Sequence, residues 1–395
     1  MGLRKMGWRD EVKRIARDAA NKAEELFDTG KRRLAERFPR NRERYVQPYR
    51  GYASETALWV GGRVLEQKPP GGPQDDDGLW ENLLNTYRRW ESDEVPDEPV
   101  TLMLAGRSYE THSDDEGYAF FEVPLAAPLP RGESWHQGHL ALGVVGEAPE
   151  GEPAAAAVEV MTVPPSASFG VISDVDDTVL HTGVTDLVTA ARLTFLGNAK
   201  TRKPLDGVAA LYRAFRNGVG GDGEPHANPI FYVSSSAWNL YDLLADFLDL
   251  NDIPRGPLML QDVGFSGTLS KGDHRHKLEK ATAIVDAFPH LPFVLIGDSG
   301  QHDAALYAEL ARERPGRVIA IYIRDVDPGE ASTRDEFVAE HGALAEQHGV
   351  PLLHVGDGLE IAAHAVELGL LAPSFLEAVR ASKDRDEVRE EEGVG

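Results

Sequence analysis

The sequence contains no cysteine among its 395 residues. Disulfide bonds, thiol catalysis and thiolate metal sites are therefore excluded. No stretch approaches the roughly 20 apolar residues that a membrane-spanning helix needs, and no apolar stretch follows the basic start Met1-Gly2-Leu3-Arg4-Lys5. We therefore expect neither a membrane span nor a secretory signal. The absence of cysteine suits a reducing compartment, which predicts a cytoplasmic protein.

Positive charge is scarce over most of the chain. The 41 Lys and Arg residues are outnumbered by 65 Asp and Glu residues, which gives a formal net charge of −24. This balance disfavours nucleic acid as a partner, because phosphate backbones repel an acidic surface. Residues 1–50 are the exception, with 15 Lys and Arg against 8 Asp and Glu. The sequence therefore predicts a basic arm followed by an acidic body.

The basic arm over residues 1–50 contains a predicted amphipathic helix at residues 6–38. Trp8, Val12, Ile15 and Ala19 recur at three- and four-residue steps, with Arg and Lys between them. Two interpretations stay open. The helix packs on the body, or residues 1–45 contact an anionic lipid surface and bring the protein to the inner face of a membrane.

Residues 51–163 predict a small β-sandwich, because short β-rich runs alternate with turn-rich stretches. A helix is expected within this module at Leu79–Trp90. We find no catalytic cluster in the module, so a structural or recognition role is expected. The predicted strands cover residues 56–65, 100–105, 118–123, 139–145 and 158–163.

The pattern changes to alternating strands and helices after Pro164-Pro165-Ser166, so residues 164–372 are predicted to form an α/β domain. Its strands are solidly apolar, which is typical of a parallel sheet covered by helices on both faces. Residues 373–395 are acidic, and the stretch from Lys383 has few apolar residues, so this tail is predicted to be disordered. The predicted strands are 171–172, 230–233, 258–260, 293–296, 318–323 and 351–355, and the predicted helices are 205–217, 240–248, 277–288, 304–312 and 359–370.

Polar side chains follow three of the predicted strands of this domain. Asp174 and Asp176 follow the first strand, Ser234 follows the second, and Asp298 follows the strand at 293–296. Ligands of an open parallel sheet bind beyond the carboxyl ends of its strands, so we expect these groups at one edge. Lys277 opens the helix that leads into the strand before Asp298 and supplies an ammonium.

This set of groups suits metal-assisted phosphoryl transfer. Carboxylate oxygens are the ligands that Mg²⁺ prefers, and Asp174, Asp176 and Asp298 can supply them. A carboxylate beside the metal can attack phosphorus, while Lys277 and the Ser234 hydroxyl bind the phosphoryl oxygens. We expect Asp174 to be the nucleophile and Asp176 to exchange protons with the leaving group and with water.

For several roles in the site, alternative residues or functions stay open. Lys271 competes with Lys277 for the role of the site lysine, and Ser235 is the register alternative to Ser234, which could also cap the helix at Leu240. Asp303 could reach the metal through a water molecule or could orient Lys277. Lys200, Arg202 and Lys203 face either an anionic headgroup or solvent.

The sequence resembles the haloacid dehalogenase superfamily at each of its four motifs. The first is Asp174-Val175-Asp176-Asp177-Thr178, the second is Ser234 after Phe231-Tyr232-Val233, the third is a lysine, and the fourth is Gly297 to Asp303. In that superfamily the first aspartate is the nucleophile and the second is the acid/base, and Thr178 matches the usual companion of the pair. The resemblance implies a Rossmann-like parallel sheet; the segment from Val179 to Lys203, where superfamily members often place a cap, is too short for a large one.

The resemblance is narrower over residues 168–330. Ile172 to Thr178, Tyr232 to Asn239 and Ile296 to Asp303 resemble the actin-patch-associated phosphatidate phosphatase family, although Ala237 stands where proline is expected. This implies Mg²⁺-dependent hydrolysis of phosphatidate to diacylglycerol, so the expected partner is a phosphate-bearing, anionic lipid. Two alternatives remain: a phosphatase of a soluble phosphomonoester, and a non-catalytic adaptor that binds through the β module.

Overall fold

A computed structural model describes residues 44–66, 94–130, 133–143, 155–175, 178–179, 207–219, 227–261, 275–326 and 332–392. Several predictions fall outside these residues and stay predictions. They are the helices at 6–38 and 79–90, the cap segment after Val179, Asp176 and Lys271. All the described residues belong to one compact unit that begins at Arg44.

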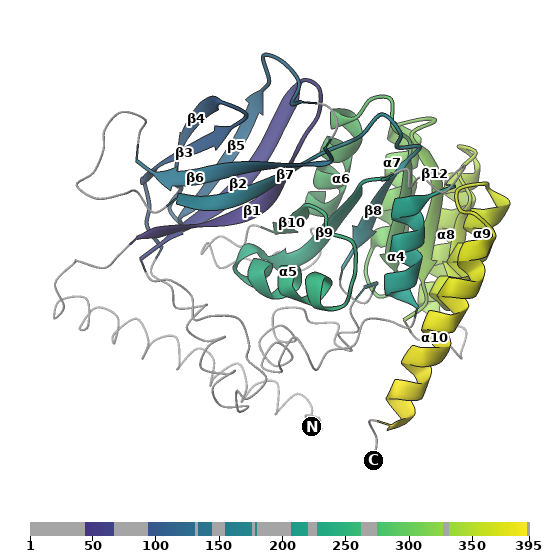
Figure 1. Cartoon of the computed structure of the whole chain (residues 1–395). Helices are drawn as coiled ribbons and strands as arrows, with labels where there is room; N and C mark the ends of the chain where they lie inside the picture. Colours follow the sequence, from purple (N-terminus) through teal and green to yellow (C-terminus); the bar gives the residue numbers. More distant parts are fainter. Residues whose placement is uncertain are drawn as a thin grey trace, which may run out of the picture. The chain divides into compact units, whose positions relative to one another are not determined.

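The β module is confirmed as a β structure, but its seven strands join in one continuous sheet instead of two separate ones. The order of strands is β4-β3-β6-β7-β1-β2-β5, and β4 and β5 at the two ends contact each other, so the sheet curls toward a barrel (Figure 1). The strands are β1 (Tyr45–Ala53), β2 (Ala57–Leu65), β3 (Pro99–Leu104), β4 (Arg107–His112), β5 (Tyr118–Pro124), β6 (Trp135–Leu142) and β7 (Ala155–Thr162).

Strand β1 corrects the predicted boundary between the arm and the module. The prediction placed that boundary at residue 50, but β1 begins at Tyr45 and pairs with β2 on one side and β7 on the other. The prediction grouped residues 1–50 by their many basic residues and so missed the strand, because Arg44 and Arg50 belong to the sheet region. Arg50 forms ion pairs with Glu159 on β7 and with Asp249 of the following domain, so its charge serves tertiary contacts.

The second sheet has six strands, all parallel, in the order β10-β9-β8-β11-β12-β13. In chain order this is the doubly wound arrangement in which the direction of winding reverses between β8 and β11. The α/β prediction for this domain is confirmed. The strands are β8 (Gly170–Asp174), β9 (Ile230–Ala237), β10 (Leu258–Gln261), β11 (Phe293–Asp298), β12 (Val318–Arg324) and β13 (Leu352–Val355).

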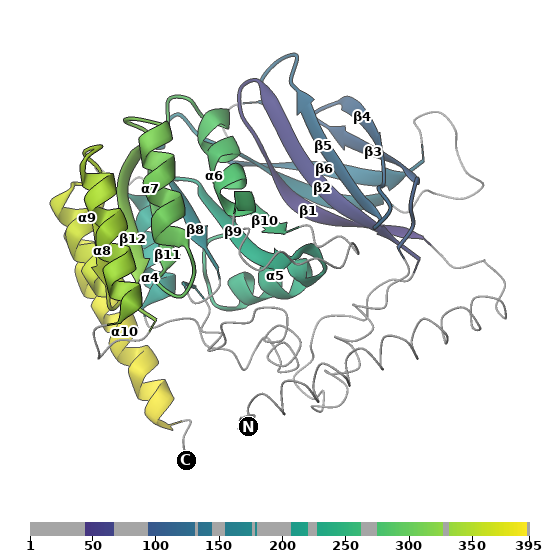
Figure 2. The same ribbon diagram turned by 180° about the vertical axis from the view of Figure 1, so that it is seen from behind.

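Helices cover both faces of the parallel sheet (Figures 1 and 2). Helices α4, α9 and α10 contact one another on one face, and α6, α7 and α8 pack in sequence on the other. None of the helices in the described residues is both long and apolar enough to cross a membrane. The helices are α4 (Val208–Asn217), α5 (Tyr241–Leu250), α6 (Arg275–Ala287), α7 (Asp303–Glu313), α8 (Thr333–Glu346), α9 (Gly358–Glu367) and α10 (Ser374–Glu392), with a 3-10 turn at Trp238–Leu240.

Helix α10 corrects the prediction that residues 373–395 are disordered. Residues 374–392 are helical and pack on α4 and α9. Val379 is fully buried, and Phe375 and Leu376 pack beside it, so a short apolar face at helical spacing holds the segment to the domain. Lys383 adds an ion pair to Asp357. The acidic composition of the tail masked these few apolar contacts.

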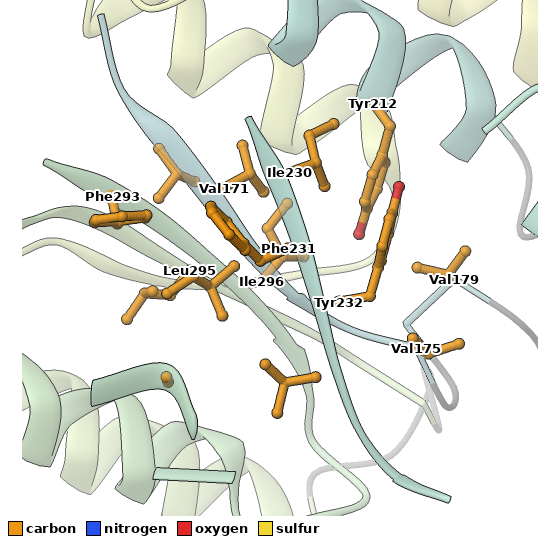
Figure 3. Close-up of a cluster of buried hydrophobic side chains, with 14 of the residues drawn as sticks. Val171, Val175, Val179, Tyr212, Ile230, Phe231, Tyr232, Phe293, Leu295 and Ile296 are labelled. Carbon is orange, nitrogen blue, oxygen red and sulfur yellow. The ribbon is translucent and has the colours of Figure 1, made fainter. Parts of the chain in front are cut away.

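The core of the α/β domain lies under the strands that carry the polar motifs. Val171, Phe231 and Leu295 come from the adjacent strands β8, β9 and β11 and are fully buried. Tyr212 from α4 stacks on Tyr232 of β9 with ring centroids 6.2 Å apart (Figure 3). Burial on both faces explains why these strands are continuous apolar runs, and it makes the strand ends rigid supports.

Aromatic rings join the β module to the α/β domain. Tyr49 on β1 stacks on Trp238 with ring centroids 4.8 Å apart, and Tyr52 contacts Phe231 edge to face. The backbone N–H of Arg50 donates to the hydroxyl of Tyr241 at 2.6 Å. The aromatic residues named here belong to one buried cluster with the core of the parallel sheet. The module is therefore packed against the domain and not merely tethered to it.

Candidate active site

The candidate site lies where the winding of the parallel sheet reverses. Asp174 ends β8 and Asp298 ends β11, and these two strands are neighbours. Diverging connections leave a crevice beyond the carboxyl ends of such strands, which is where ligands of this sheet type bind. Both carboxylates are fully buried. The expectation that the sheet brings them to one edge is confirmed by this topology.

Lys277 lies between Asp174 and a third aspartate, Asp303. It lies in the first turn of α6 and is 1% exposed. Its Nζ lies 2.8 Å from Asp174 Oδ1 and 2.9 Å from Asp303 Oδ1, and it donates to Gln301 Oε1 at 2.9 Å. Burial lowers the pKa of the ammonium, but the charges of Asp174, Asp303 and Asp298 outweigh burial and raise the pKa above its ordinary value. Lys277 is therefore a fixed cation at neutral pH.

The loop after β11 holds Asp298 by its backbone. Asp298 Oδ1 accepts hydrogen bonds from the backbone N–H groups of Gly300 and Gln301, at 2.7 and 2.9 Å. A Cβ atom on Gly300 would come within 2.9 Å of that same oxygen. The glycine thus allows the close turn, and the turn directs the carboxylate.

Asp303 is the first residue of α7 and is also fully buried. Its Oδ2 accepts from the backbone N–H of Asp298 at 3.3 Å, while its Oδ1 faces Lys277. A carboxylate in the first turn is stabilised by the helix dipole. A Cβ atom on Gly297 would lie 2.6 Å from the Asp303 side chain, so the glycine leaves the space that this carboxylate occupies.

Three buried carboxylates form a group that could hold a divalent cation. One oxygen from each of Asp174, Asp298 and Asp303 lies within 4.8 Å of the others. Oxygen donors of this kind suit Mg²⁺, which binds through a few carboxylates and keeps several waters. Within the described residues the group combines three negative charges with the one ammonium of Lys277. A buried excess of negative charge is costly, and a bound cation would remove that cost.

The serines of β9 lie beside Asp174. Strand β9 pairs with β8 so that Val233 is opposite Asp174, and Ser234 comes next. Ser234 is fully buried, and its Oγ accepts from the backbone N–H of Ser236 at 2.8 Å. It lies within the strand and does not cap the helix that follows, so that alternative is wrong. The Oγ of Ser235 is buried without a hydrogen-bond partner in the described residues, so Ser235 remains available for a ligand.

Thr178 supports the strand end that carries Asp174. Its Oγ1 donates to Asp174 Oδ2 at 3.5 Å, and its side chain is buried. One residue before the aspartate, Ser173 shares a short hydrogen bond with the hydroxyl of Tyr212. Burial raises the pKa of Tyr212, so its hydroxyl stays protonated. The Ser173 hydroxyl also donates to the backbone carbonyl of Asp174 at 2.6 Å, so hydroxyl groups contact both the carboxylate and the backbone of Asp174.

The structure brings together five of the residues predicted from the sequence: Asp174, Thr178, Lys277, Asp298 and Asp303. Asp176 and Lys271 lie outside the described residues, so their roles stay predictions. Sequence reasoning missed the role of Gln301, which contacts Lys277. Its place in the polar run after β11 was a usable signal, since loops at such strand ends line the crevice.

Part of the chain matches a known protein family. Residues 169–325 match the family model described as the catalytic domain of the phosphatidate phosphatase APP1. This segment is similar to the APP1 catalytic-domain family. It starts just before β8 and ends just after β12, so the APP1-type segment carries every carboxylate of the candidate site together with Lys277.

Two curated fungal proteins match a part of the chain of similar length. The chain is 34% identical over 159 residues to the phosphatidate phosphatase APP1 of Saccharomyces cerevisiae, which covers 40% of this chain and 26% of that protein. It is 30% identical over 162 residues to the uncharacterized protein C29B5.04c of Schizosaccharomyces pombe, which covers 40% and 25%. The chain therefore matches about a quarter of the length of these relatives.

Solved structures are much less similar. A carbohydrate acetylesterase from Xanthomonas citri, XAC1771, is 11% identical, with 78% of this chain and 68% of that chain covered, at a TM-score of 0.29. The minor pilin PilB of Streptococcus sanguinis is 10% identical, with 74% and 87% covered, at a TM-score of 0.27. Scores this low establish no shared fold.

Proposed function

We propose that this protein is a Mg²⁺-dependent phosphatidate phosphatase that works through an aspartyl-phosphate intermediate. The observation that carries the proposal is the meeting of Asp174, Asp298 and Asp303, with ligand oxygens within 4.8 Å of one another, around the ammonium of Lys277. The APP1-type catalytic segment supports phosphatidate as the substrate. The parallel order of the sheet and the four motifs support a haloacid-dehalogenase-like fold for this segment.

The chemistry requires two transfers at phosphorus. An oxygen of Asp174 attacks the phosphorus atom, the bond to the lipid oxygen breaks, and Asp176 gives its proton to the departing diacylglycerol oxygen. Water then attacks the phosphorus of the aspartyl-phosphate, Asp176 takes a proton from that water, and inorganic phosphate leaves with Asp174 restored. The two steps conserve charge and return every residue to its starting state.

The remaining contribution to catalysis comes from positioning of the phosphoryl group and from the charges around it. Mg²⁺, when bound, neutralises charge on the phosphoryl oxygens. Asp174 and Asp298 would hold the metal with Asp176, and Asp303 would reach it directly or through water. Lys277 holds a second positive charge next to Asp174, and Ser234 or Ser235 can donate hydrogen bonds to the phosphoryl group. Thr178 and Gln301 keep Asp174 and Lys277 in place.

The test is release of phosphate from phosphatidate in mixed micelles, with Mg²⁺ and with EDTA, beside a panel of soluble phosphomonoesters. We expect release that depends on Mg²⁺, prefers phosphatidate and falls by about 10³-fold or more in an Asp174→Asn variant. Asp286→Asn is the matched control, because Asp286 lies on the exposed side of α6 and pairs with Arg314.

Each other outcome points to a different function. Release from soluble esters alone would keep the mechanism and reject the lipid substrate. Release that persists in the Asp174→Asn variant would reject Asp174 as the nucleophile. No release from any ester by the wild-type protein would leave the β module, acting as an adaptor, as the function to pursue.

A further inference from the structure

A groove lies between the β module and the α/β domain, outside the group of carboxylates. It has a volume of about 930 Å³, which is within the range of small-molecule binding sites. Strands β2 and β5 form one wall, and α6, the end of β10 and the turn after β9 form the other. Side chains that set its character are Tyr52, Trp59, Phe120, Trp238, Met259 and Lys280.

Aromatic and apolar side chains form most of the lining of this groove, and the carboxylates of Glu122 and Glu279 lie among its polar groups. Trp59 and Trp238 stack with ring centroids 5.9 Å apart, and Phe120 packs against both. The indole N–H of Trp59 donates to Glu122 at 3.1 Å. The ammonium of Lys280 lies 5.3 Å above the ring of Trp238. An occupant would therefore meet mainly ring faces and methyl groups, with one ammonium and two carboxylates beside them.

Helix α6 connects the groove to the candidate active site. Lys277 points from this helix into the carboxylate group, while His276, Lys280 and Ala283 of the same helix line the groove. The second connection is the sheet edge, because Gln261 at the end of β10 pairs with Ala237 at the end of β9, three residues after Ser234. Groove and site thus share the carboxyl edge of the parallel sheet.

We propose that this groove binds an acyl chain of a phospholipid whose headgroup is a phosphate monoester. The inference rests on the proposed function and adds the place where the apolar part of the substrate binds. A phosphate at Asp174 leaves its diacylglycerol part to be accommodated nearby, and the groove offers apolar surface along the same sheet edge.

The occupant is a lipid chain and not a soluble phosphate ester, because the carboxylates of Glu122 and Glu279 line the groove and repel a phosphate group. Among the donors of the lining, Trp59 Nε1 faces Glu122 and Lys280 Nζ faces the ring of Trp238. Burial of methylene groups against aromatic rings needs no such donors and removes apolar surface from water.

The direct test uses tryptophan fluorescence of the full chain, because Trp59 and Trp238 line the groove. The probe is short-chain phosphatidate with bromine atoms on its acyl chains, kept monomeric, with glycerol 3-phosphate as the headgroup control. Bromine quenches an indole only when the two are in near contact. We expect saturable quenching by the bromolipid and none by glycerol 3-phosphate. Ala283→Phe, which fills the groove at an exposed position of α6, should weaken the affinity by about tenfold.

Ala343→Phe is the matched control, since Ala343 is exposed on α8 and does not line the groove. The bromolipid should quench the tryptophan fluorescence of this variant as it does that of the wild type. In parallel, the ratio of kcat/KM for dioctanoyl phosphatidate to that for glycerol 3-phosphate should fall about tenfold in Ala283→Phe and stay unchanged in Ala343→Phe. Quenching that is absent in the wild type, or equal in the two variants, overturns the inference. Quenching without hydrolysis of any ester supports the chain-binding groove and rejects the proposed function.

Discussion

The ammonium of Lys277 lies 2.8 Å from Asp174 Oδ1, although the two residues come from α6 and from the end of β8. Asp303 holds the same ammonium at 2.9 Å. This arrangement makes Lys277 the internal counter-charge of the carboxylate group and a positive group next to the proposed nucleophile. It also ties the stability of the site to a single side chain.

Replacement of Lys277 by methionine is expected to destabilise the protein and to abolish hydrolysis. The variant leaves buried carboxylates without their ammonium, and breaking a buried ion pair costs about 3–5 kcal/mol. Urea unfolding measures the change. Lys280→Met on the same helix is the control, since Lys280 is partly exposed and its ammonium lies over the face of Trp238. Equal stability of the two variants would contradict the counter-charge role.

Addition of Mg²⁺ is expected to raise the melting temperature of the wild-type protein. A cation that binds only the folded state adds about 2.7 kcal/mol to the free energy of unfolding when its concentration is 100 times its Kd. Asp298→Asn should abolish most of this stabilisation, because it removes a charged ligand from the group. Thermal unfolding with Mg²⁺ and with EDTA measures the effect. A response that persists in the variant would place the metal elsewhere.

Gly297→Ala is expected to reduce activity strongly, although the substitution adds only one methyl group. The added methyl group would lie 2.6 Å from Asp303, so the carboxylate that holds Lys277 must move. Overpacking of this kind costs about 1–3 kcal/mol. Gly342→Ala on α8 is the control, because its new Cβ atom would meet neighbours at 3.7 Å or more. The control should be neutral or stabilising, since alanine favours helix. Both are measured by phosphate release and by urea unfolding.

The free energy of unfolding is expected to depend on pH through the carboxyl group of Asp357. It caps α9 by accepting from Leu359 and Glu360, and Lys383 lies 2.6 Å away. Burial raises its pKa, but the hydrogen bond from Lys383 and the backbone N–H groups outweigh this, and the pKa lies below its usual value. A lowered pKa in the folded state stabilises the protein above the unfolded value of about 3.9, and this is lost as pH falls through the folded pKa.

The Asp357→Asn variant tests this dependence, because asparagine keeps the cap and removes the charge. At pH 7 the variant should be less stable than the wild type by on the order of 1 kcal/mol or less, since the pair is partly exposed. The difference should shrink below about pH 4. Unfolding curves between pH 7 and pH 3.5 measure it. A difference that stays constant over this range would show that the charge is not responsible.

The sequence predicted the α/β domain with small errors at the ends of its elements. The strand expected at residues 293–296 spans Phe293–Asp298, and the helix expected at 304–312 spans Asp303–Glu313. Strand β4, Arg107–His112, was not predicted because it has no apolar run. Helix α8 was not predicted either, since only Val338 and Ala345 are buried on it and its capping box at Ser332 and Asp335 carries the signal.

The sequence by itself determined which segments are buried strands and which polar residues follow them, because both are local patterns along the chain. The tertiary structure alone decided that Lys277 faces Asp174 and Asp303, that Arg50 and Tyr49 join the β module to the α/β domain, and that α6 lines a groove on its other face. Contacts between distant segments depend on how elements pack, and a periodicity of two or 3.6 residues carries no information about the partner.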